Sequence, residues 1–146
     1  MLTQTVEYAL RALVALAAHP DQPQTNRQLA EVTKVPGPYL SKVLQTLTKE
    51  GLVETHRGIR GGFCLARPAK QITILDAVNA VDPIHRIDVC PLGLKAHGKR
   101  LCPLHKKMDA ALAQMEEAFG STTLADVLAE PSKSVPLCDF PRMTRA

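Results

Sequence analysis

The stretch LVETHRGIRGGFCLAR, residues 52–67, constrains the fold of this chain more than any other feature. Two short apolar runs flank a segment that holds Gly58, Gly61 and Gly62 together with Arg57 and Arg60. Short apolar runs on either side of a glycine-rich turn predict a β-hairpin. Because an isolated two-stranded hairpin is marginally stable in water, this one has to pack against neighbouring helices.

Three segments before the hairpin have the apolar spacing of amphipathic helices. The first covers residues 5–17 and ends at a proline-containing turn. In the second, Thr25 and Gln28 have the spacing of a capping box. The third has Pro38 at its expected first position, and Gly51 follows its last apolar turn. The sequence therefore predicts three helices ahead of the hairpin.

This order of elements predicts a winged helix-turn-helix, that is, a mainly α fold with a small β-wing. A further short helix is expected in ITILDAVNAVDP, capped at Thr73, and the DNA-binding domain is assigned to residues 1–83. Aromatic residues make up only 3% of the chain and Trp is absent, so the core must consist of Leu, Val, Ile and Ala. The alternative is a small α+β domain whose basic hairpin is merely solvated.

The C-terminal half divides into three further parts. Residues 84–103 have little regular pattern and contain two cysteines, which makes them a candidate sensing loop. Residues 104–130 resume helical periodicity, with a long helix to Phe119 and then a short one, while 131–146 are expected to form a flexible tail. A lone amphipathic helix beyond a completed domain lacks an apolar neighbour, so we expect it to form the interface of a homodimer.

Charge and composition restrict the function. The net charge is +4 and the pI is near 9.0. Residues 55–75 contain no acidic residue, and residues 84–107 contain six Lys or Arg against one Asp. These patches are compatible with a polyanionic partner. The most apolar N-terminal run is interrupted by Arg11 and is too short to cross a bilayer, so we expect a cytoplasmic protein with no membrane partner. In that compartment its four cysteines are more readily inert, metal-ligating or redox-active than disulfide-bonded.

The polar face of the third predicted helix carries Tyr39, Ser41, Lys42 and Gln45 near its N-terminal end. In helix-turn-helix proteins this end approaches base edges in the major groove. Gln pairs with adenine, Lys donates to guanine, and Ser or Tyr commonly contacts phosphate. The alternative for any one of them is an ordinary solvated helix face.

Arg57 and Arg60 flank the glycine-containing turn of the hairpin. A thin loop of this kind can enter a minor groove, where the negative potential favours arginine. The predicted partner is therefore double-stranded DNA, and a two-fold symmetric dimer implies a pseudo-palindromic site. An adaptor that uses its winged helix for protein contacts instead of DNA is the rival hypothesis, and it would show no salt-dependent affinity for duplex DNA.

The segment CPLGLKAHGKRLCPLH, residues 90–105, contains the tripeptide Cys-Pro-Leu twice, starting at Cys90 and at Cys102. His105 follows three residues after Cys102. From the residues alone it is a metal pocket, a redox pair or an ordinary loop. The Cys102–His105 pair is also the one candidate for a thiol nucleophile with a base. No oxyanion loop or substrate motif accompanies it, so no enzymatic activity is expected.

Several stretches resemble the Rrf-type family of bacterial transcriptional regulators. These are TVEYALRALVALA, the run from LSKVLQTLTKEGLV through the RGIRGGF hairpin, ITILDAVNAVD and the cysteine segment. The resemblance covers about Thr3 to Glu130. It implies a DNA-binding dimer with a winged helix and a long crossing helix, acting as a repressor that senses redox state, nitric oxide or iron–sulfur status.

The resemblance also implies a cofactor. Cluster-binding members typically carry C-x5-C-x5-C, and some of them have a histidine three residues after the last cysteine. Cys90, Cys102 and His105 match this pattern, while Ala96 stands at the middle position. A 2Fe–2S cluster would take a fourth ligand from Glu7 of the partner subunit in such a family member, with His97 as the other candidate.

Other possibilities stay open for this segment. They are a dithiol switch, a zinc ion, inert cysteines, and a cluster-free regulator that acts through a protein partner or a small ligand. With Ala96 at the middle position a cluster would be labile, so the purified protein could contain none. Of the remaining cysteines, Cys64 is expected in the core of the hairpin, and Cys138 has no evident partner in the tail.

Overall fold

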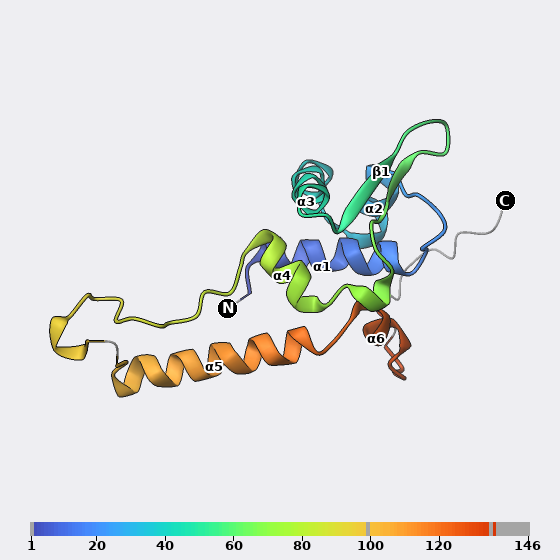
Figure 1. Cartoon of the computed structure of the whole chain (residues 1–146). Helices are drawn as coiled ribbons and strands as arrows, with labels where there is room; N and C mark the ends of the chain where they lie inside the picture. Colours follow the sequence, from blue (N-terminus) through green and yellow to red (C-terminus); the bar gives the residue numbers. More distant parts are fainter. Residues whose placement is uncertain (1, 99, 135, 137–146) are drawn as a thin grey trace.

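The computed structural model describes residues 2–98, 100–134 and 136, and it is mainly helical with one two-stranded antiparallel sheet (Figure 1). The α-helices are α1 (Gln4–Ala17), α2 (Asn26–Thr33), α3 (Gly37–Lys49), α4 (Ile74–Val81), α5 (Pro103–Gly120) and α6 (Leu124–Ala129). The strands are β1 (Val53–His56) and β2 (Gly62–Leu65), and the short 3-10 helices are η1 (Ala69–Gln71) and η2 (Lys95–His97). This order confirms the predicted winged helix-turn-helix with a long helix after it.

Capping explains why the short helices begin where they do. At α2 the Thr25 hydroxyl accepts a hydrogen bond from the Gln28 N–H, and the Gln28 side chain accepts one from the Thr25 N–H, which confirms the capping box. α3 begins at Gly37, so Pro38 is its second residue rather than its first. Both positions suit proline because first-turn N–H groups have no acceptor within the helix. Gly51 follows Glu50, the C-cap of α3, and has φ +77, as expected of a terminating glycine.

The wing is fastened to the segment that leads into α2. β1 and β2 pair in register from Val53–Leu65 to His56–Gly62. Beyond this ladder, Gln24 and Phe63 form an isolated bridge in which each N–H donates to the other residue's carbonyl, at 3.0 and 2.7 Å. Gln24 is only 1% exposed, and its side-chain amide donates to the Ala15 carbonyl of α1. Sequence reasoning missed Gln24.

One hydrophobic cluster joins the winged helix. Its fully buried large side chains are Leu13 and Leu16 of α1, Leu29 of α2, Leu40, Leu44 and Leu47 of α3, Ile72 and Leu124. Leu124 belongs to α6, and its N–H donates to the Ile72 carbonyl, while Thr73 and Thr123 form a bridge. The chain therefore returns to the body after α5, a packing that the sequence did not predict.

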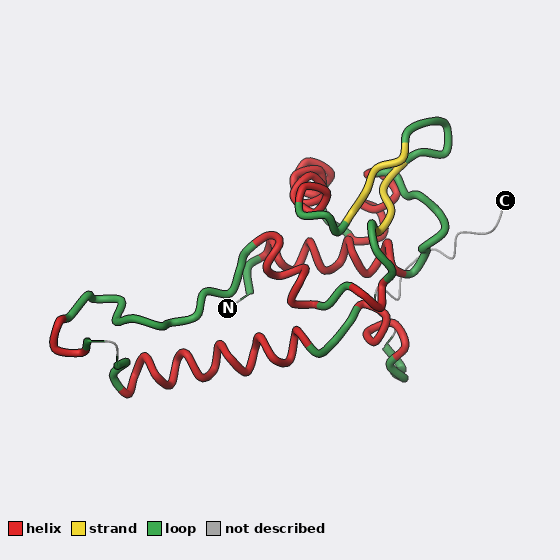
Figure 2. Tube along the Cα trace, in the orientation of Figure 1, coloured by secondary structure: helices red, strands yellow, loops and turns green. Residues whose placement is uncertain are grey.

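α5 extends away from this body, and the segment 82–102, here called the arm, runs out from α4 beside it and returns at its start (Figure 2). The helix confirms the predicted periodicity from Leu104 to Phe119 and extends it by one residue at each end. None of its residues is buried within the chain, and Leu104 and Met108 are 64% and 47% exposed. Within the described residues no helix combines the length and apolar character needed to cross a membrane.

A charged cluster ties the arm to α5. The Arg86 guanidinium donates to both carboxylate oxygens of Asp109, at 2.7 Å each, and to Glu116 at 3.1 Å. The Ile87 N–H donates to the same Asp109 carboxylate. The hydrogen bonds from Arg86, and then the one from Ile87, lower the pKa of Asp109 to about 2. We call this set of four residues the clamp.

Candidate nucleic-acid interface and cysteine site

α3 and the wing lie on one side of α1, and α5 lies on the other (Figure 1), while α4 packs against both α1 and α3. β1 packs directly against α3, so the base of the wing and the helix are in contact. The polar groups that could touch DNA and the cysteine-bearing arm therefore occupy opposite sides of the molecule. A signal from the arm would have to pass through α4 or α5 to reach α3.

The outward face of α3 carries most of the predicted base-contacting residues. Tyr39, Lys42 and Gln45 are exposed, whereas the apolar residues on the other side of the helix are buried in the core. Ser41 is different because its hydroxyl oxygen accepts a hydrogen bond from the Asn26 side chain at 2.9 Å. That bond joins the starts of α2 and α3, so Ser41 also fixes the angle between the two helices. Sequence reasoning did not find Asn26.

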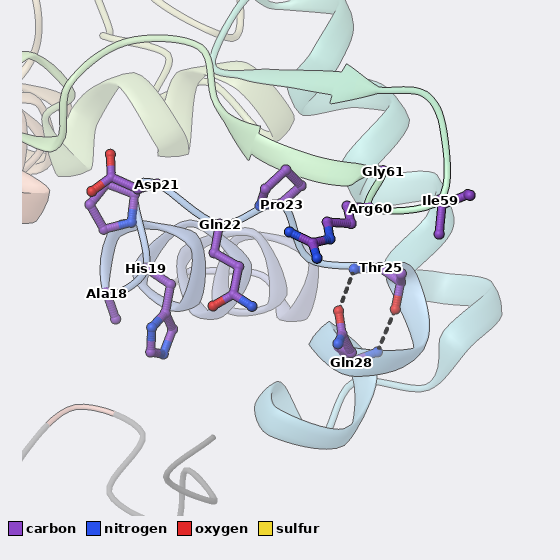
Figure 3. Close-up of a pocket in the computed structure, with 11 residues that line it drawn as sticks. Ala18, His19, Asp21, Gln22, Pro23, Thr25, Gln28, Ile59, Arg60 and Gly61 are labelled. Atoms are coloured by element: carbon purple, nitrogen blue, oxygen red, sulfur yellow. Dashed lines mark hydrogen bonds between the residues drawn. The ribbon is translucent and has the colours of Figure 1, made fainter. Parts of the chain in front are cut away.

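Both predicted wing arginines are exposed, but they are not equivalent. Arg60 extends back over a hollow between the wing tip and the α1–α2 connection, toward Gln22 and Pro23 (Figure 3). Ile59, next to it, also lines this hollow, and its side chain is fully exposed. The end of the wing is thus occupied by an apolar side chain that the sequence analysis did not single out.

Cys90 lies in a turn that stabilises a thiolate. The residue is 8% exposed, and the turn is closed by a hydrogen bond from the Gly93 N–H to the Cys90 carbonyl, with Gly93 at φ +64. The pKa of the Cys90 thiol is lowered by three hydrogen bonds. In decreasing order of effect, they come from the Leu94 N–H, the His97 side chain and the Leu92 N–H. Hydrogen bonds of this kind favour the charged form of the sulfur. The surroundings of Cys90 are therefore of the kind that suits a nucleophilic or a metal-ligating cysteine.

His97 has an unusual environment beside this sulfur. Its Nδ1 is buried, and no described residue forms a hydrogen bond with it. A buried ring nitrogen without a partner is destabilising by about 1–3 kcal/mol, so such atoms are rare in native structures. A metal ion or a water molecule at this nitrogen would satisfy it. His97 stands next to Ala96, the position at which the family pattern has its middle cysteine.

Cys102 and His105 form a second pair at the start of α5. The Cys102 sulfur and His105 Nδ1 are 3.3 Å apart, which is within hydrogen-bonding distance for sulfur. Cys102 precedes the first residue of the helix, and His105 lies on its first turn. The sequence-predicted neighbours are thus brought together, as thiol and imidazole.

The full predicted ligand set is not gathered in one chain. Among the described residues, no three or more His, Cys, Asp or Glu side chains lie close enough to hold a metal ion. Glu7 forms an ion pair with Arg11 on α1, at 2.9 Å. The kinds of donor nevertheless fit a metal or an iron–sulfur cluster, since the arm and the first turn of α5 offer two thiols, Cys90 and Cys102, and two imidazoles, His97 and His105.

The other two cysteines take no part in this arrangement. Cys64 on β2 is half-buried rather than fully in the core, because it lies on a two-stranded ribbon with little to cover it. Burial, and then the nearby charge of Glu54, raise the pKa of its thiol. Cys138 lies outside the described residues, as does most of the predicted tail.

Comparison with known proteins identifies the family. The model of the Rrf2 family, described as an iron-dependent transcriptional regulator, matches residues 2–130. A protein of Aquifex aeolicus (strain VF5), described as an HTH-type transcriptional regulator, is 33% identical over 131 residues, which make up 88% of this chain and 91% of the relative.

Solved structures show the same fold. IscR of T. potens superimposes with a TM-score of 0.74 at 25% identity, and the match covers 92% of this chain and 93% of that one. CymR, the global cysteine regulator of B. subtilis, superimposes with a TM-score of 0.72 at 24% identity, over 87% of this chain and 95% of that one. With its winged helix-turn-helix and a family match over nearly the whole described chain, the protein belongs to the Rrf2 family of transcriptional regulators.

Proposed function

We propose that this chain is a homodimeric repressor that binds pseudo-palindromic double-stranded DNA and senses a redox, nitric-oxide or iron–sulfur signal through Cys90 and Cys102. It would act in the cytoplasm, where its DNA lies. The observation that carries the sensing part is the turn around Cys90, in which two backbone N–H groups and an imidazole favour the thiolate. An inert structural cysteine needs no such surroundings.

The DNA-binding surface is supported by exposure and by charge. Lys42 and Gln45 on α3 present long polar side chains to solvent, as a helix that contacts base edges must. Arg57 lies in the exposed loop of the wing and can supply charge toward phosphates or a minor groove. Ser41 positions α3 through Asn26 and can still donate its hydroxyl hydrogen.

The homodimer is supported by the apolar surface that the single chain leaves open. Leu104 and Met108 are four residues apart and share a face of α5, and both are largely exposed. In the arm, Val89, Leu92 and Leu94 are exposed as well. A second copy placed across α5 about a two-fold axis would cover these side chains, and it would place two α3 helices on one DNA site.

An iron–sulfur cluster or another metal would be held by Cys90, Cys102 and His105. The fourth ligand would be Glu7 of the other subunit, or His97, whose side chain forms a hydrogen bond with Cys90 and whose Nδ1 has no partner among the described residues. When bound, a cluster supplies a centre that reacts with oxidants and nitric oxide. The N–H groups of Leu92 and Leu94 would stabilise the charge on the ligating sulfur, as hydrogen bonds to cluster sulfurs do.

A cluster-free thiol switch is the second candidate, and the lowered pKa of Cys90 favours it specifically. A thiolate reacts with oxidants where a thiol does not. In both cases the clamp supplies the mechanical link. Arg86 is four residues before Cys90 and is bound to Asp109 of α5, so a change in the turn around Cys90 is passed to α5 over a short path.

The deciding experiment is anaerobic purification followed by an absorption spectrum and by iron, sulfide and zinc analysis. The wild type is compared with Cys90→Ala, Cys102→Ala and His97→Ala, and Cys64→Ala is the matched control because that thiol lies on the wing. Colour that is lost in both arm-cysteine variants and kept in Cys64→Ala supports the cluster. Zinc, or no metal after anaerobic reconstitution, refutes the cluster and leaves the thiol switch.

The thiol switch has its own readout. Fluorescence anisotropy with a selected palindromic duplex is measured before and after mild oxidation, which is then reversed by a thiol reductant. The switch predicts a reversible change in affinity that disappears in Cys90→Ala and persists in Cys64→Ala. If oxidation changes the affinity of Cys90→Ala as it does that of the wild type, Cys90 is not the sensor.

A further inference from the structure

The tip of the wing is a tight turn with an unexpected residue in it. Its four residues run from Gly58 to Gly61, and the Gly61 N–H donates to the Gly58 carbonyl at 3.0 Å. Ile59 and Arg60 occupy the two central positions, where Gly, Pro, Asn, Asp and Ser are the common residues. A β-branched, apolar side chain contributes nothing to such a turn. The local backbone therefore does not account for Ile59.

The turn is also narrow. A Cβ atom at Gly61 would lie 2.4 Å from the His56 carbonyl oxygen, so the two sides of the loop approach as closely as backbone atoms allow. Gly58 has φ +111, a conformation that strongly favours glycine. The loop is thin enough to enter a groove, and its glycines permit the tight backbone conformation.

The side chain of Ile59 is fully exposed and points outward from the wing (Figure 3). Single exposed apolar side chains are common on protein surfaces, so exposure alone carries no meaning. What distinguishes Ile59 is its position at the end of the wing of a DNA-binding fold, between two arginines. Arg60, the other central residue of the turn, extends back over the hollow, whereas the Ile59 side chain is fully exposed at the end of the loop.

The base of the wing is fastened to the body of the winged helix. The reciprocal hydrogen bonds between Gln24 and Phe63 fasten β2 to the α1–α2 connection. At Gly62 a Cβ would lie 2.6 Å from the Gln24 backbone, so the two segments are in direct contact. The wing cannot bend away at this point without breaking that bridge.

We propose that Ile59 is an apolar wedge that enters the minor groove with the wing, partly unstacks one base-pair step and bends the duplex. This goes beyond the repressor function proposed above and rests only on DNA binding by the winged helix. Proteins that insert Ile, Leu, Phe or Met between base pairs act in this way. Pyrimidine–purine steps such as TA and CA are the most easily unstacked, so the wedge would select them without a hydrogen bond to any base.

The test uses a duplex selected for binding, with the step under the wing varied among TA, CA and an A-tract. Affinity is measured by anisotropy, bending by energy transfer between end labels, and unstacking by the fluorescence of 2-aminopurine placed at the step. The variants are Ile59→Ala, Ile59→Leu as the conservative control, and Arg57→Ala as the control for charge.

The wild type and Ile59→Leu should prefer the TA step to the A-tract by about tenfold, bend the duplex and raise the 2-aminopurine fluorescence. Ile59→Ala should lose all three effects and keep the dependence of affinity on salt, because no charge is removed. Arg57→Ala should reduce the salt dependence and keep the preference for TA.

Two results overturn the wedge. In one, Ile59→Ala binds every duplex as the wild type does. In the other, Ile59→Ala binds all the duplexes more weakly by the same factor, with no change in bending or 2-aminopurine fluorescence. That result would mean that the side chain contacts the DNA backbone and does not enter the base stack. If the wild type binds no duplex at all, the DNA-binding function fails and the wedge fails with it.

Discussion

Replacing Gly62 with alanine tests whether the wing is fastened to the body through its contact with Gln24. Gly62 has φ +153, and the added Cβ would lie 2.6 Å from the Gln24 backbone carbon and oxygen. These are backbone atoms, so no flexible side chain can move aside. The matched control is Gly51→Ala, since Gly51 also has a positive φ, +77, but nothing lies within 4 Å of its added Cβ.

Both substitutions place a side chain at positive φ, and only Gly62→Ala adds a clash with backbone atoms. A residue other than glycine at positive φ is destabilising by about 1–2 kcal/mol, and Gly51→Ala should show that strain and no more. Gly62→Ala adds the loss of the two hydrogen bonds between Gln24 and Phe63, each with a net worth of about 1 kcal/mol. We therefore expect Gly62→Ala to lower the free energy of unfolding by about 3–4 kcal/mol, roughly 2 kcal/mol more than Gly51→Ala.

Urea denaturation followed by circular dichroism measures both values, and anisotropy with a palindromic duplex measures DNA affinity at concentrations where each variant is folded. Gly62→Ala should also bind DNA more weakly, because the wing is displaced from α3, whereas Gly51→Ala should bind as the wild type does. Equal losses of stability in the two variants would falsify the idea that the Gln24–Phe63 bridge holds the wing.

Three further outcomes are expected. Arg57→Ala should weaken binding to every duplex and flatten the salt dependence, whereas Gln45→Ala or Lys42→Ala should alter the preference among sequences by about 1–3 kcal/mol per lost base contact, as competition between duplexes will show. Met108→Lys should give a monomer at micromolar concentration in sedimentation experiments, with the exposed Lys107→Ala as a control that stays dimeric. The pKa of Asp109 is lowered to about 2 from its usual 3.8. The stability that the Asp109 carboxylate contributes is therefore complete above about pH 4 and is lost as the pH falls toward 2. In urea denaturation, the difference in free energy of unfolding between the wild type and Asp109→Asn should shrink over that range.

Local chemistry explains which parts of the fold could be predicted. The capping pair Thr25 and Gln28, the terminating Gly51 and the cap at Thr73 act over three or four residues, and all four were read correctly from the sequence. The hairpin was found because its glycine-rich turn leaves few other structures open. Element order then predicted the winged helix, since few folds place a two-stranded ribbon after three helices.

Contacts between distant residues could not be predicted in this way. Gln24 looks like an ordinary loop residue until Phe63 is placed beside it, and Asn26 gains its role only from Ser41 on the next helix. The return of α6 to the core depends on Leu124 meeting Ile72, across the whole length of the arm and α5. In each case one partner carries no local pattern, and the pairing comes from the tertiary fold.

In the cysteine segment, the sequence indicated which residues matter but not which of their side chains lie together. Spacing drew attention to Cys90, Cys102 and His105, and the structure pairs Cys102 with His105. It also places His97 beside Cys90, where the sequence analysis had named it only as an alternative. Backbone N–H groups supply much of the environment of Cys90, and every residue type carries the same N–H, so the side-chain sequence gives little warning of them.

The distribution of buried side chains explains why a sensor belongs in the arm. The core lies in the winged helix and α6, whereas Cys90 is the one buried residue among the described residues of the arm, and α5 has none. Without a core of its own, the arm is ordered by the turn around Cys90, the clamp at Arg86 and whatever covers α5. A ligand or an oxidant at Cys90 acts on one of these few contacts, so its binding energy is large relative to the energy that holds the arm in place. The same event at a residue such as Leu44, deep in the winged helix, would have to overcome the whole core.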